Sequence, residues 1–285
     1  MKEKYKGIVY ITISAFFFAL MSLFVKLSGD LPVFQKSFFR NVVAVFFAGS
    51  IVLKSKSKIK LDKSNLGILI LRSTLGTIGI LCNFYAVDHM LLADASILSK
   101  LAPFFAILMG ALILGEKLKP FQIGAVIVAF IGALLIIKPG SGLIAAPALI
   151  GTLGGLCAGT AYTLVRLLGK KGVSGPFIVF FFSAFSCVVI APFMIMDFRP
   201  MALNQLLCLL MAGLCASFAQ FSVTAAYCHA PAREISVFDY SQIVFSAILG
   251  FFIFHQVPDI YSWIGYAIII FTAIANFIYS NKKSA

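Results

Sequence analysis

Charged residues are scarce in this chain: they make up 12% of its 285 residues, whereas hydrophobic residues make up 61%. A soluble globular protein is typically about a quarter charged and about half apolar. The surplus of apolar side chains has no protein interior large enough to hold it, so lipid is the expected solvent. This composition excludes a secreted enzyme, a nucleic-acid-binding protein and a disordered scaffold.

Cysteine pairs and a cleavable leader are also missing. The six cysteines stand singly inside apolar stretches and none belongs to a CxxC pair. The sequence therefore indicates neither a disulfide framework nor a zinc site, and it predicts no metal and no cofactor. The apolar run from Gly7 to about Val25 is too long for a signal peptide and lacks a small-x-small cleavage site. We expect this run to be the first membrane span.

Apolar stretches long enough to cross a bilayer as helices fill almost the whole chain, and its length accommodates about ten of them. Helices are expected because a lipid-exposed strand edge would leave backbone groups unpaired. The predicted fold is therefore an all-α polytopic membrane protein. Its ten spans are predicted at residues 7–27, 32–53, 66–87, 91–114, 120–138, 147–168, 175–196, 203–227, 231–254 and 260–280.

The basic residues predict the orientation in the membrane. Lysine and arginine number 23, against 10 acidic residues. With a cytoplasmic N-terminus, sixteen of them fall in cytoplasmic segments and three, Lys36, Lys138 and Arg199, in outer segments. Cytoplasmic loops carry the excess of Lys and Arg in membrane proteins. Both termini are therefore predicted on the cytoplasmic side of a cell's inner membrane.

The chain also resembles itself at an offset of 140 residues, which aligns Asp94 with Glu234. The two predicted repeats, residues 1–142 and 143–285, contain five spans each. Because five is odd, the second repeat must enter the membrane from the opposite face. Inverted repeats of this kind are the architecture of alternating-access transporters, which hold the substrate near mid-membrane between the halves.

Three segments closely resemble the signature region of EamA-type proteins, which belong to the drug/metabolite transporter superfamily. They are 84–86 (FYA), 98–104 (LSKLAPF) and 114–118 (LGEKL), and Arg40 matches an arginine frequent in the family's second span. The resemblance implies ten helices and alternating access. It also implies a cavity built by the first, third, fourth, sixth, eighth and ninth helices.

The second half departs from the family pattern at two positions. Gln256 stands near the position of Glu116, and Ile243 stands at the position of Pro103. The family's substrates include amino acids, amphipathic metabolites, nucleotide derivatives and drugs. The resemblance does not choose among these substrates.

Four cations and one acid fall within predicted spans: Lys26, Arg40, Arg72, Lys100 and Asp239. An ionised side chain in the hydrocarbon region costs several kcal/mol, so it normally faces a cavity or a partner. The excess of cations predicts a positively biased cavity for a carboxylate, a phosphate or a zwitterion. For Lys26 and Arg72 the alternative is that they extend to the membrane interface from near their span ends.

The repeat makes Lys100 and Asp239 the leading candidates. At the offset of 140, Lys100 aligns with Tyr240 and Ser99 aligns with Asp239. The two charges are therefore expected at similar heights, where they pair or share a ligand. A pair that substrate or a proton breaks would act as a switch between states, because one buried charge left alone is strongly unfavourable.

Polar residues at helical spacing supply further candidates, with inter-helix hydrogen bonds as the alternative role for each. Pro103 removes a backbone hydrogen bond and is predicted to soften its helix for gating, or to form a static kink. The remaining substrate-binding candidates are Ser96 beside Lys100, Asn83 and Tyr85 in the third span, Gln220 and Tyr227 in the eighth, and Tyr240.

Other classes of protein are weaker interpretations of the same sequence. A GxSG pattern at 172–175 and His229 resemble a rhomboid protease dyad, but Ser174 is expected in a cytoplasmic turn. A channel would need a filter sequence, and none is present. A multidrug or cationic amphipath exporter remains the main alternative, in which the 30 Phe and 9 Tyr would line the cavity.

We therefore predict a secondary transporter rather than an enzyme. Its partners are the lipid bilayer and a small anionic or zwitterionic metabolite, of the amino acid or carboxylate type, which it exports or exchanges. No nucleic-acid partner is predicted. The oligomeric state is left open, with a monomer as one possibility.

Overall fold

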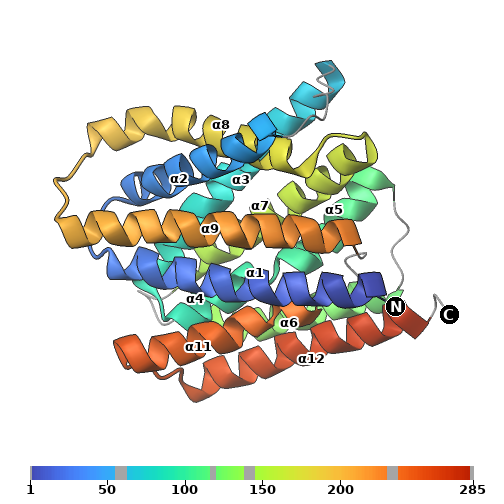
Figure 1. Ribbon diagram of the computed structural model, residues 1–285. Helices are drawn as coiled ribbons and strands as arrows, with labels where there is room; N and C mark the ends of the chain where they lie inside the picture. The colour runs from blue at the N-terminus through green and yellow to red at the C-terminus, as the bar shows by residue number, and fades with distance from the viewer. Residues whose placement is uncertain (1, 55–62, 116–119, 138–144, 230–236, 283–285) are drawn as a thin grey trace.

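The computed structural model describes residues 2–54, 63–115, 120–137, 145–229 and 237–282 (Figure 1). Its helices form ten segments that are long and apolar enough to cross a membrane, which confirms the predicted all-α fold. Glu116, Glu234 and the basic residues of the loop at 55–62 lie outside the described residues. The helices are α1 (Lys2–Leu27), α2 (Val33–Lys54), α3 (Lys63–His89), α4 (Leu92–Ser99), α5 (Ala102–Leu114), α6 (Pro120–Ile137), α7 (Ala145–Lys170), α8 (Gly175–Met196), α9 (Leu203–His229), α11 (Ser241–Phe254) and α12 (Ile260–Lys282).

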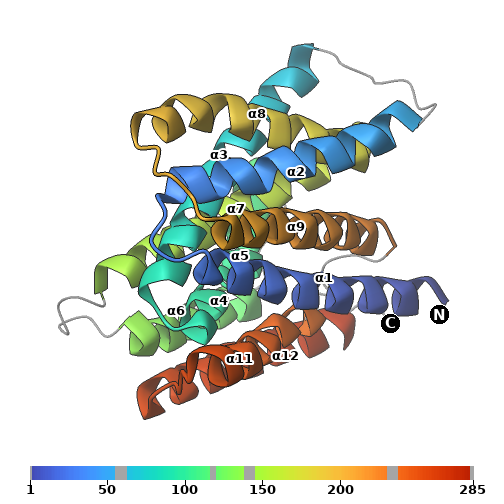
Figure 2. The same cartoon turned by 60° about the vertical axis from the view of Figure 1, so that its left-hand side comes forward.

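The helices are arranged in layers. Helices α2 and α8 lie along one side of the bundle, α1 and α9 run through the middle, and α11 and α12 lie along the opposite side (Figure 1, Figure 2). Helix α1 begins and α12 ends at the same end of the bundle in both views. An even number of spans returns the chain to the side on which it began, so ten spans agree with the common end of the two termini.

Contacts between helices follow a regular pattern. The most extensive are those of α1 with α9 and of α3 with α7. The contact of α2 with α9 has a counterpart in that of α8 with α3, and the contact of α5 with α7 has one in that of α1 with α11. Each pair maps onto the other when the first five spans are exchanged for the last five.

The fourth span is interrupted, and here the structure corrects the prediction of one continuous helix at 91–114. Helix α4 ends at Ser99 and α5 begins at Ala102, with Lys100 and Leu101 in a turn between them. Pro103 explains the break, because its ring removes an N–H and clashes with the carbonyl four residues earlier, that of Ser99.

The ninth span has a turn at the aligned position. Residues 237–239 are helical, Tyr240 is a turn residue, and α11 begins at Ser241. The N–H of Tyr240 donates to the carbonyl of Val237, and the N–H of Ile243 donates to the carbonyl of Tyr240. No proline stands at position 243, so the proline explanation does not extend to this turn.

Small residues bring helices close to the break in the fourth span. A Cβ added to Gly155 would lie 2.9 Å from the carbonyl oxygen of Leu98, and one added to Gly159 would lie 2.4 Å from that of Ala102. Helix α7 therefore packs against the backbone on both sides of the break. This is the close helix packing that a GxxxG pattern favours.

Helices α6 and α12 also meet through glycines. A Cβ on Gly265 would lie 2.7 Å from the carbonyl oxygen of Gly132, and a Cβ on Gly132 would lie 2.9 Å from Ile269. The two helices therefore cross with their backbones nearly touching.

Candidate functional site

A buried ion pair joins the two interrupted spans. The ammonium of Lys100 lies 2.7 Å from Oδ2 of Asp239, and both side chains are almost enclosed, at 8% and 12% exposure. The ammonium also lies 5.9 Å from the ring centroid of Phe18 on α1. The contact expected from the repeat alignment is therefore present, and it connects the first half of the chain to the second.

Two hydrogen bonds lie beside this pair. The hydroxyl of Tyr240 donates to the carbonyl oxygen of Lys100 at 3.0 Å, in the turn where α4 ends. The hydroxyl of Ser96 donates to that of Ser246 at 2.7 Å, from α4 to α11. The candidates Ser96 and Tyr240 therefore make inter-helix hydrogen bonds in this conformation.

A second polar cluster lies between α2, α3 and α8. Arg40 and Arg72 are both buried, at 3% exposure each. Arg40 donates from Nη1 to Oδ1 of Asn41, and the guanidinium of Arg72 lies 3.9 Å from the ring centroid of Phe182. Nε of Arg40 and both Nε and Nη1 of Arg72 have no hydrogen-bond partner among the described residues. Both guanidinium groups are therefore enclosed by protein.

Tyr162 of α7 connects the two clusters. Its phenol interacts electrostatically with Arg40, with Arg72 and with Asp239. The two arginines also interact with each other. The ion pair and the arginine cluster are therefore neighbouring parts of one buried polar region in the bundle.

Lys26 has a different environment. Its ammonium donates to the carbonyl oxygens of Val87 at 2.8 Å and of Met90 at 2.5 Å, at the end of α3. The last carbonyls of a helix have no partner within it, and a cation there is favoured by the helix dipole. The bonds of Lys26 therefore join α1 to α3 in this conformation, and its role in substrate binding stays a prediction.

Lys36 is buried, which the sequence did not predict. It lies in the first turn of α2 at 1% exposure and forms an ion pair of 2.6 Å with Asp88 of α3. Its assignment to the outer side of the membrane stays a prediction. The pair was detectable in principle, since Lys36 and Asp88 carry opposite charges near adjoining ends of consecutive spans.

The end of the bundle away from the termini is closed by bonds between the halves. Gln35 of α2 forms two bonds with the backbone of Arg199, donating to its carbonyl at 2.8 Å and accepting from its N–H at 3.0 Å. Gln205 donates to the carbonyl of Ser28, and Tyr266 donates to Asp94 at 2.6 Å. Each of these bonds joins a residue of the first five spans to one of the last five.

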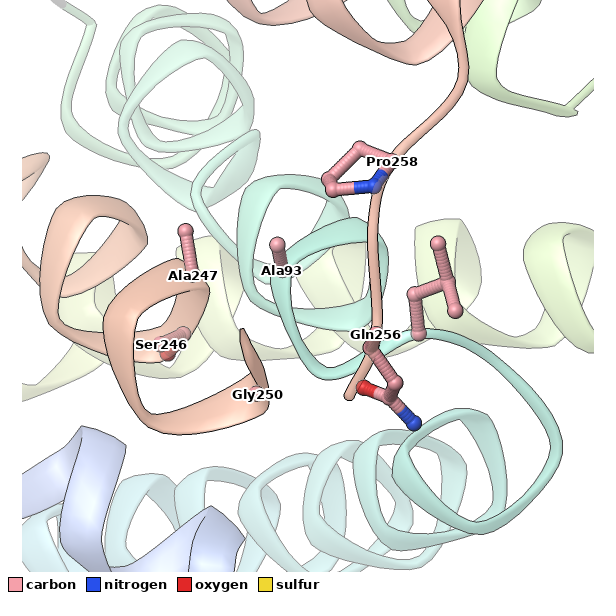
Figure 3. A pocket seen from close by; sticks show the side chains of 7 residues that line it. Ala93, Ser246, Ala247, Gly250, Gln256 and Pro258 are labelled. Carbon is pink, nitrogen blue, oxygen red and sulfur yellow. The ribbon is translucent and has the colours of Figure 1, made fainter. Parts of the chain in front are cut away.

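Gln256 provides a further bond at this end. Its side-chain oxygen accepts the N–H of Leu92 at 3.0 Å, so it satisfies the first turn of α4, where Leu91 supplies no side-chain cap. Figure 3 shows Gln256 and Pro258 bordering a hollow between α4 and α11, with Ser246 and Gly250 on its other side. The charged candidates do not line this hollow.

The remaining candidates are placed as follows. Asn83 and Tyr85 are half-buried on α3, and the ring of Tyr85 stacks on His89 with centroids 4.1 Å apart. Gln220 is buried on α9, and the side chain of Tyr227 lies outside the described part. Pro103 lies just after the break. Contacts of these residues with a substrate stay predictions.

Several residues of the site were missed in the sequence. Tyr162 and Phe182 carry no signal of their own among 9 Tyr and 30 Phe. The buried hydroxyls of Ser37, Ser73 and Ser183, on the same three helices as the arginine cluster, also have no hydrogen-bond partner. Ser37 was detectable, because it stands three and four residues before Arg40 and Asn41 on one helical face.

Membrane helices that are interrupted beside buried charges are typical of transport proteins, in which they build solute sites. Comparison with known proteins gives the family. The model of the EamA-like transporter family matches residues 5–138 and 146–278. The chain belongs to this family, within the drug/metabolite transporter superfamily, and it is a multi-pass membrane protein.

Individual relatives cover nearly the whole chain. The pseudopaline exporter CntI of Pseudomonas aeruginosa (strain UCBPP-PA14) is 32% identical over 272 residues, which span 94% of this chain and 95% of that protein. The S-adenosylmethionine uptake transporter of Rickettsia prowazekii is 26% identical and spans 100% of this chain and 96% of that protein. A crystal structure matches with a TM-score of 0.70 at 14% identity, covering 98% of this chain and 99% of that one, which shows the fold alone.

Proposed function

We propose that this protein is an alternating-access secondary transporter that exports or exchanges a small anionic or zwitterionic metabolite of the amino acid or carboxylate type. Transport itself follows from the family. The named relatives include an exporter and an uptake transporter with different solutes, so they leave the solute and the direction open. The solute class is therefore argued from the buried charges.

The proposed architecture is two inverted repeats, residues 1–142 and 143–285. Two separate family matches, one in each half, support it. The exchange symmetry of the helix contacts supports it as well, since the pairs α1–α9 and α7–α3 correspond. Alternating access would then be a rocking of one half against the other around a central site.

The Lys100–Asp239 pair carries the proposal. Each partner is supplied by a different half and stands at a helix interruption, 2.7 Å from the other. Removing one partner of a buried ion pair leaves an uncompensated charge and costs about 3–5 kcal/mol. A solute carboxylate that binds Lys100, or a solute amine that binds Asp239, would take the place of the other side chain and favour the state in which the two residues have separated.

The hydrogen bonds between the halves at the end away from the termini indicate which conformational state the structure represents. The interactions of Gln35 with Arg199 and of Gln205 with Ser28 hold the halves together at the end opposite the termini. We propose that this end faces outward and that the termini are cytoplasmic, because the excess of basic residues falls at the terminal end. The structure would then correspond to an outward-closed state.

Transport of a solute by reconstituted protein tests the proposal. First, the thermal stability of purified protein is measured with amino acids, carboxylates and a lipophilic cation such as tetraphenylphosphonium, since a ligand that binds the folded state raises Tm. A solute that raises Tm is then followed in proteoliposomes by counterflow. We expect Lys100→Ala and Asp239→Ala to lose counterflow, whereas Lys170→Ala, which removes an exposed cation at the end of α7, keeps it.

Two results would contradict the proposal. Counterflow that persists in both Lys100→Ala and Asp239→Ala would show that the pair is not in the pathway. Stabilisation by tetraphenylphosphonium but by no carboxylate or amino acid would favour the multidrug alternative and end the proposed solute class.

A further inference from the structure

Among the described residues, no acidic side chain pairs with Arg40 or Arg72. The other cations in the described part of the bundle discussed above have partners: Lys36 has Asp88, Lys100 has Asp239, and the partly buried Lys26 has the end of α3. In the part of the chain that the structure describes, neither arginine forms a salt bridge. Two permanent positive charges are thus enclosed in the bundle within electrostatic reach of each other.

Burying two arginines without acid partners is energetically unfavourable unless a ligand supplies those partners. An ionised arginine within a membrane span is energetically unfavourable, and buried donors without acceptors add to that cost. Arg72 keeps one stabilising contact, the ring of Phe182. A ring face accepts no charge-assisted hydrogen bond in the plane of the guanidinium, so the donors Nε and Nη1 stay available.

The surrounding groups suit an acid. A guanidinium presents a planar fork of donors that matches a carboxylate or a phosphate. On the same three helices, Ser37 and Asn41 of α2, Ser73 of α3 and Ser183 of α8 have buried side-chain atoms without a hydrogen-bond partner. Hydroxyl groups and the amide Nδ2 of Asn41 donate hydrogen bonds to the same acid oxygens. Three helices therefore carry unpaired donors, and the one carboxylate among their described residues, that of Asp88 on α3, is paired with Lys36.

The position relative to the ion pair is informative. Tyr162 interacts electrostatically with both arginines and with Asp239. Oδ1 of Asp239, the oxygen that does not face Lys100, is buried and has no partner. The unpaired oxygen of Asp239 and the two arginines are therefore near the same tyrosine.

We infer that Arg40 and Arg72 form an acid-binding subsite separate from the Lys100–Asp239 pair, and that the solute it accepts is dianionic there. Two guanidinium charges are matched by two carboxylates or by one phosphate monoester. The inference rests on the proposed function and narrows it, because a plain zwitterionic amino acid leaves one arginine uncompensated. The ion pair then serves as the switch, and the arginines select the solute.

Thermal stability of the full-length purified protein tests the subsite directly. The probes are succinate, inorganic phosphate, acetate and the neutral succinamide, at equal ionic strength. We expect succinate or phosphate to raise Tm, acetate to raise it less, and succinamide to leave it unchanged. Whichever of succinate and phosphate gives the larger shift identifies the acid as a carboxylate pair or a phosphate.

Variants separate a binding role from a structural one. Arg40→Met and Arg72→Met are expected to bind the effective probe at least tenfold more weakly, while the Tm without ligand stays equal or rises, because an uncompensated charge is gone. Lys36→Met is the matched control: it removes a buried cation that has a partner, so Tm without ligand falls and the shift with the probe persists. Arg40→Lys keeps the positive charge but lacks the planar guanidinium donors. It replaces Arg40→Met in the binding test if Arg40→Met does not fold.

Three outcomes would overturn the subsite: no probe raises Tm, the shift is unchanged in the arginine variants, or those variants are destabilised without ligand as strongly as Lys36→Met. Failure of the subsite and failure of the proposed function give different results. Suppose that the free amino acid alanine raises Tm, and that this shift is lost in Lys100→Ala but kept in Arg40→Met and Arg72→Met. The transporter proposal then stands and the subsite is wrong. If succinate or phosphate needs the arginines but Lys100→Ala and Asp239→Ala still transport, the subsite stands and the switch is wrong.

Discussion

The hydroxyl of Tyr240 donates a hydrogen bond of 3.0 Å to the carbonyl oxygen of Lys100, and the two residues stand 140 positions apart in the chain. That distance is the offset at which the two halves of the sequence align. Each residue lies in the turn that interrupts its own span, so the bond joins the two interruptions directly. The ion pair between Lys100 and Asp239 lies beside it.

Removal of this hydroxyl tests the link between the turns. Tyr240→Phe is expected to lower the free energy of unfolding by about 1–2 kcal/mol, because the buried carbonyl of Lys100 loses its donor. Urea or thermal unfolding in detergent measures the loss. Tyr266→Phe removes the hydroxyl bound to Asp94 and serves as the comparison, since it lies away from the turns. An unchanged stability in Tyr240→Phe would mean that the bond contributes nothing.

The ion pair predicts strong non-additivity. Lys100→Met or Asp239→Asn alone is expected to destabilise the protein by about 3–5 kcal/mol, since each leaves one buried charge without its partner. The double variant is expected to be more stable than either single variant. A thermodynamic cycle built from the four proteins measures the coupling free energy. Additive losses would show that the two charges do not interact in the folded state.

Pro103 is expected to control the rate of the conformational change. Pro103→Ala restores an N–H opposite the carbonyl of Ser99, so α4 and α5 gain helical continuity and stability. We expect a higher Tm and a slower counterflow of the identified solute. Pro192→Ala, at the proline inside α8, is the control and should change stability without slowing transport. Faster or equal counterflow in Pro103→Ala would assign the proline to a static kink.

The close approach of α7 to the interruption makes its glycines sensitive. Gly159→Ala places a methyl group 2.4 Å from the carbonyl oxygen of Ala102, so α7 has to move away, at an expected cost of about 1–3 kcal/mol. Gly169→Ala on the same helix has nothing within 4 Å of the added carbon and should be neutral or stabilising. The difference in Tm between the two variants measures the packing effect, and equal values would contradict it.

Much of the fold was predictable because each membrane span leaves a local signal. Eight of the ten predicted spans each match one helix of the structure in position, and the fourth matches α4 and α5 together. The ninth, at 231–254, is described from residue 237 onward. The interruption at Lys100 was not predicted, although Pro103 was read as a softening element. Hydropathy averages over a window, so it cannot distinguish one long helix from two short ones joined at a turn.

The site was predictable only where a charge stands in an apolar stretch. Lys100, Asp239, Arg40 and Arg72 were detectable in this way, and the repeat alignment suggested which two of them meet. Tyr162 was not, because its place between the arginines and Asp239 depends on how α7 packs against other helices. The pairing of Lys36 depends likewise on the fold, which brings the ends of α2 and α3 together.

The contact between Gly132 of α6 and Gly265 of α12 has a mechanical consequence. Here one helix of each half touches the other with almost no side chain in between, so a larger residue at either glycine would push the helices apart. In the transport cycle proposed above, this contact would be a pivot about which the two halves tilt. A bulky residue at Gly132 or Gly265 would leave the Lys100–Asp239 pair intact and would still impair the conformational change.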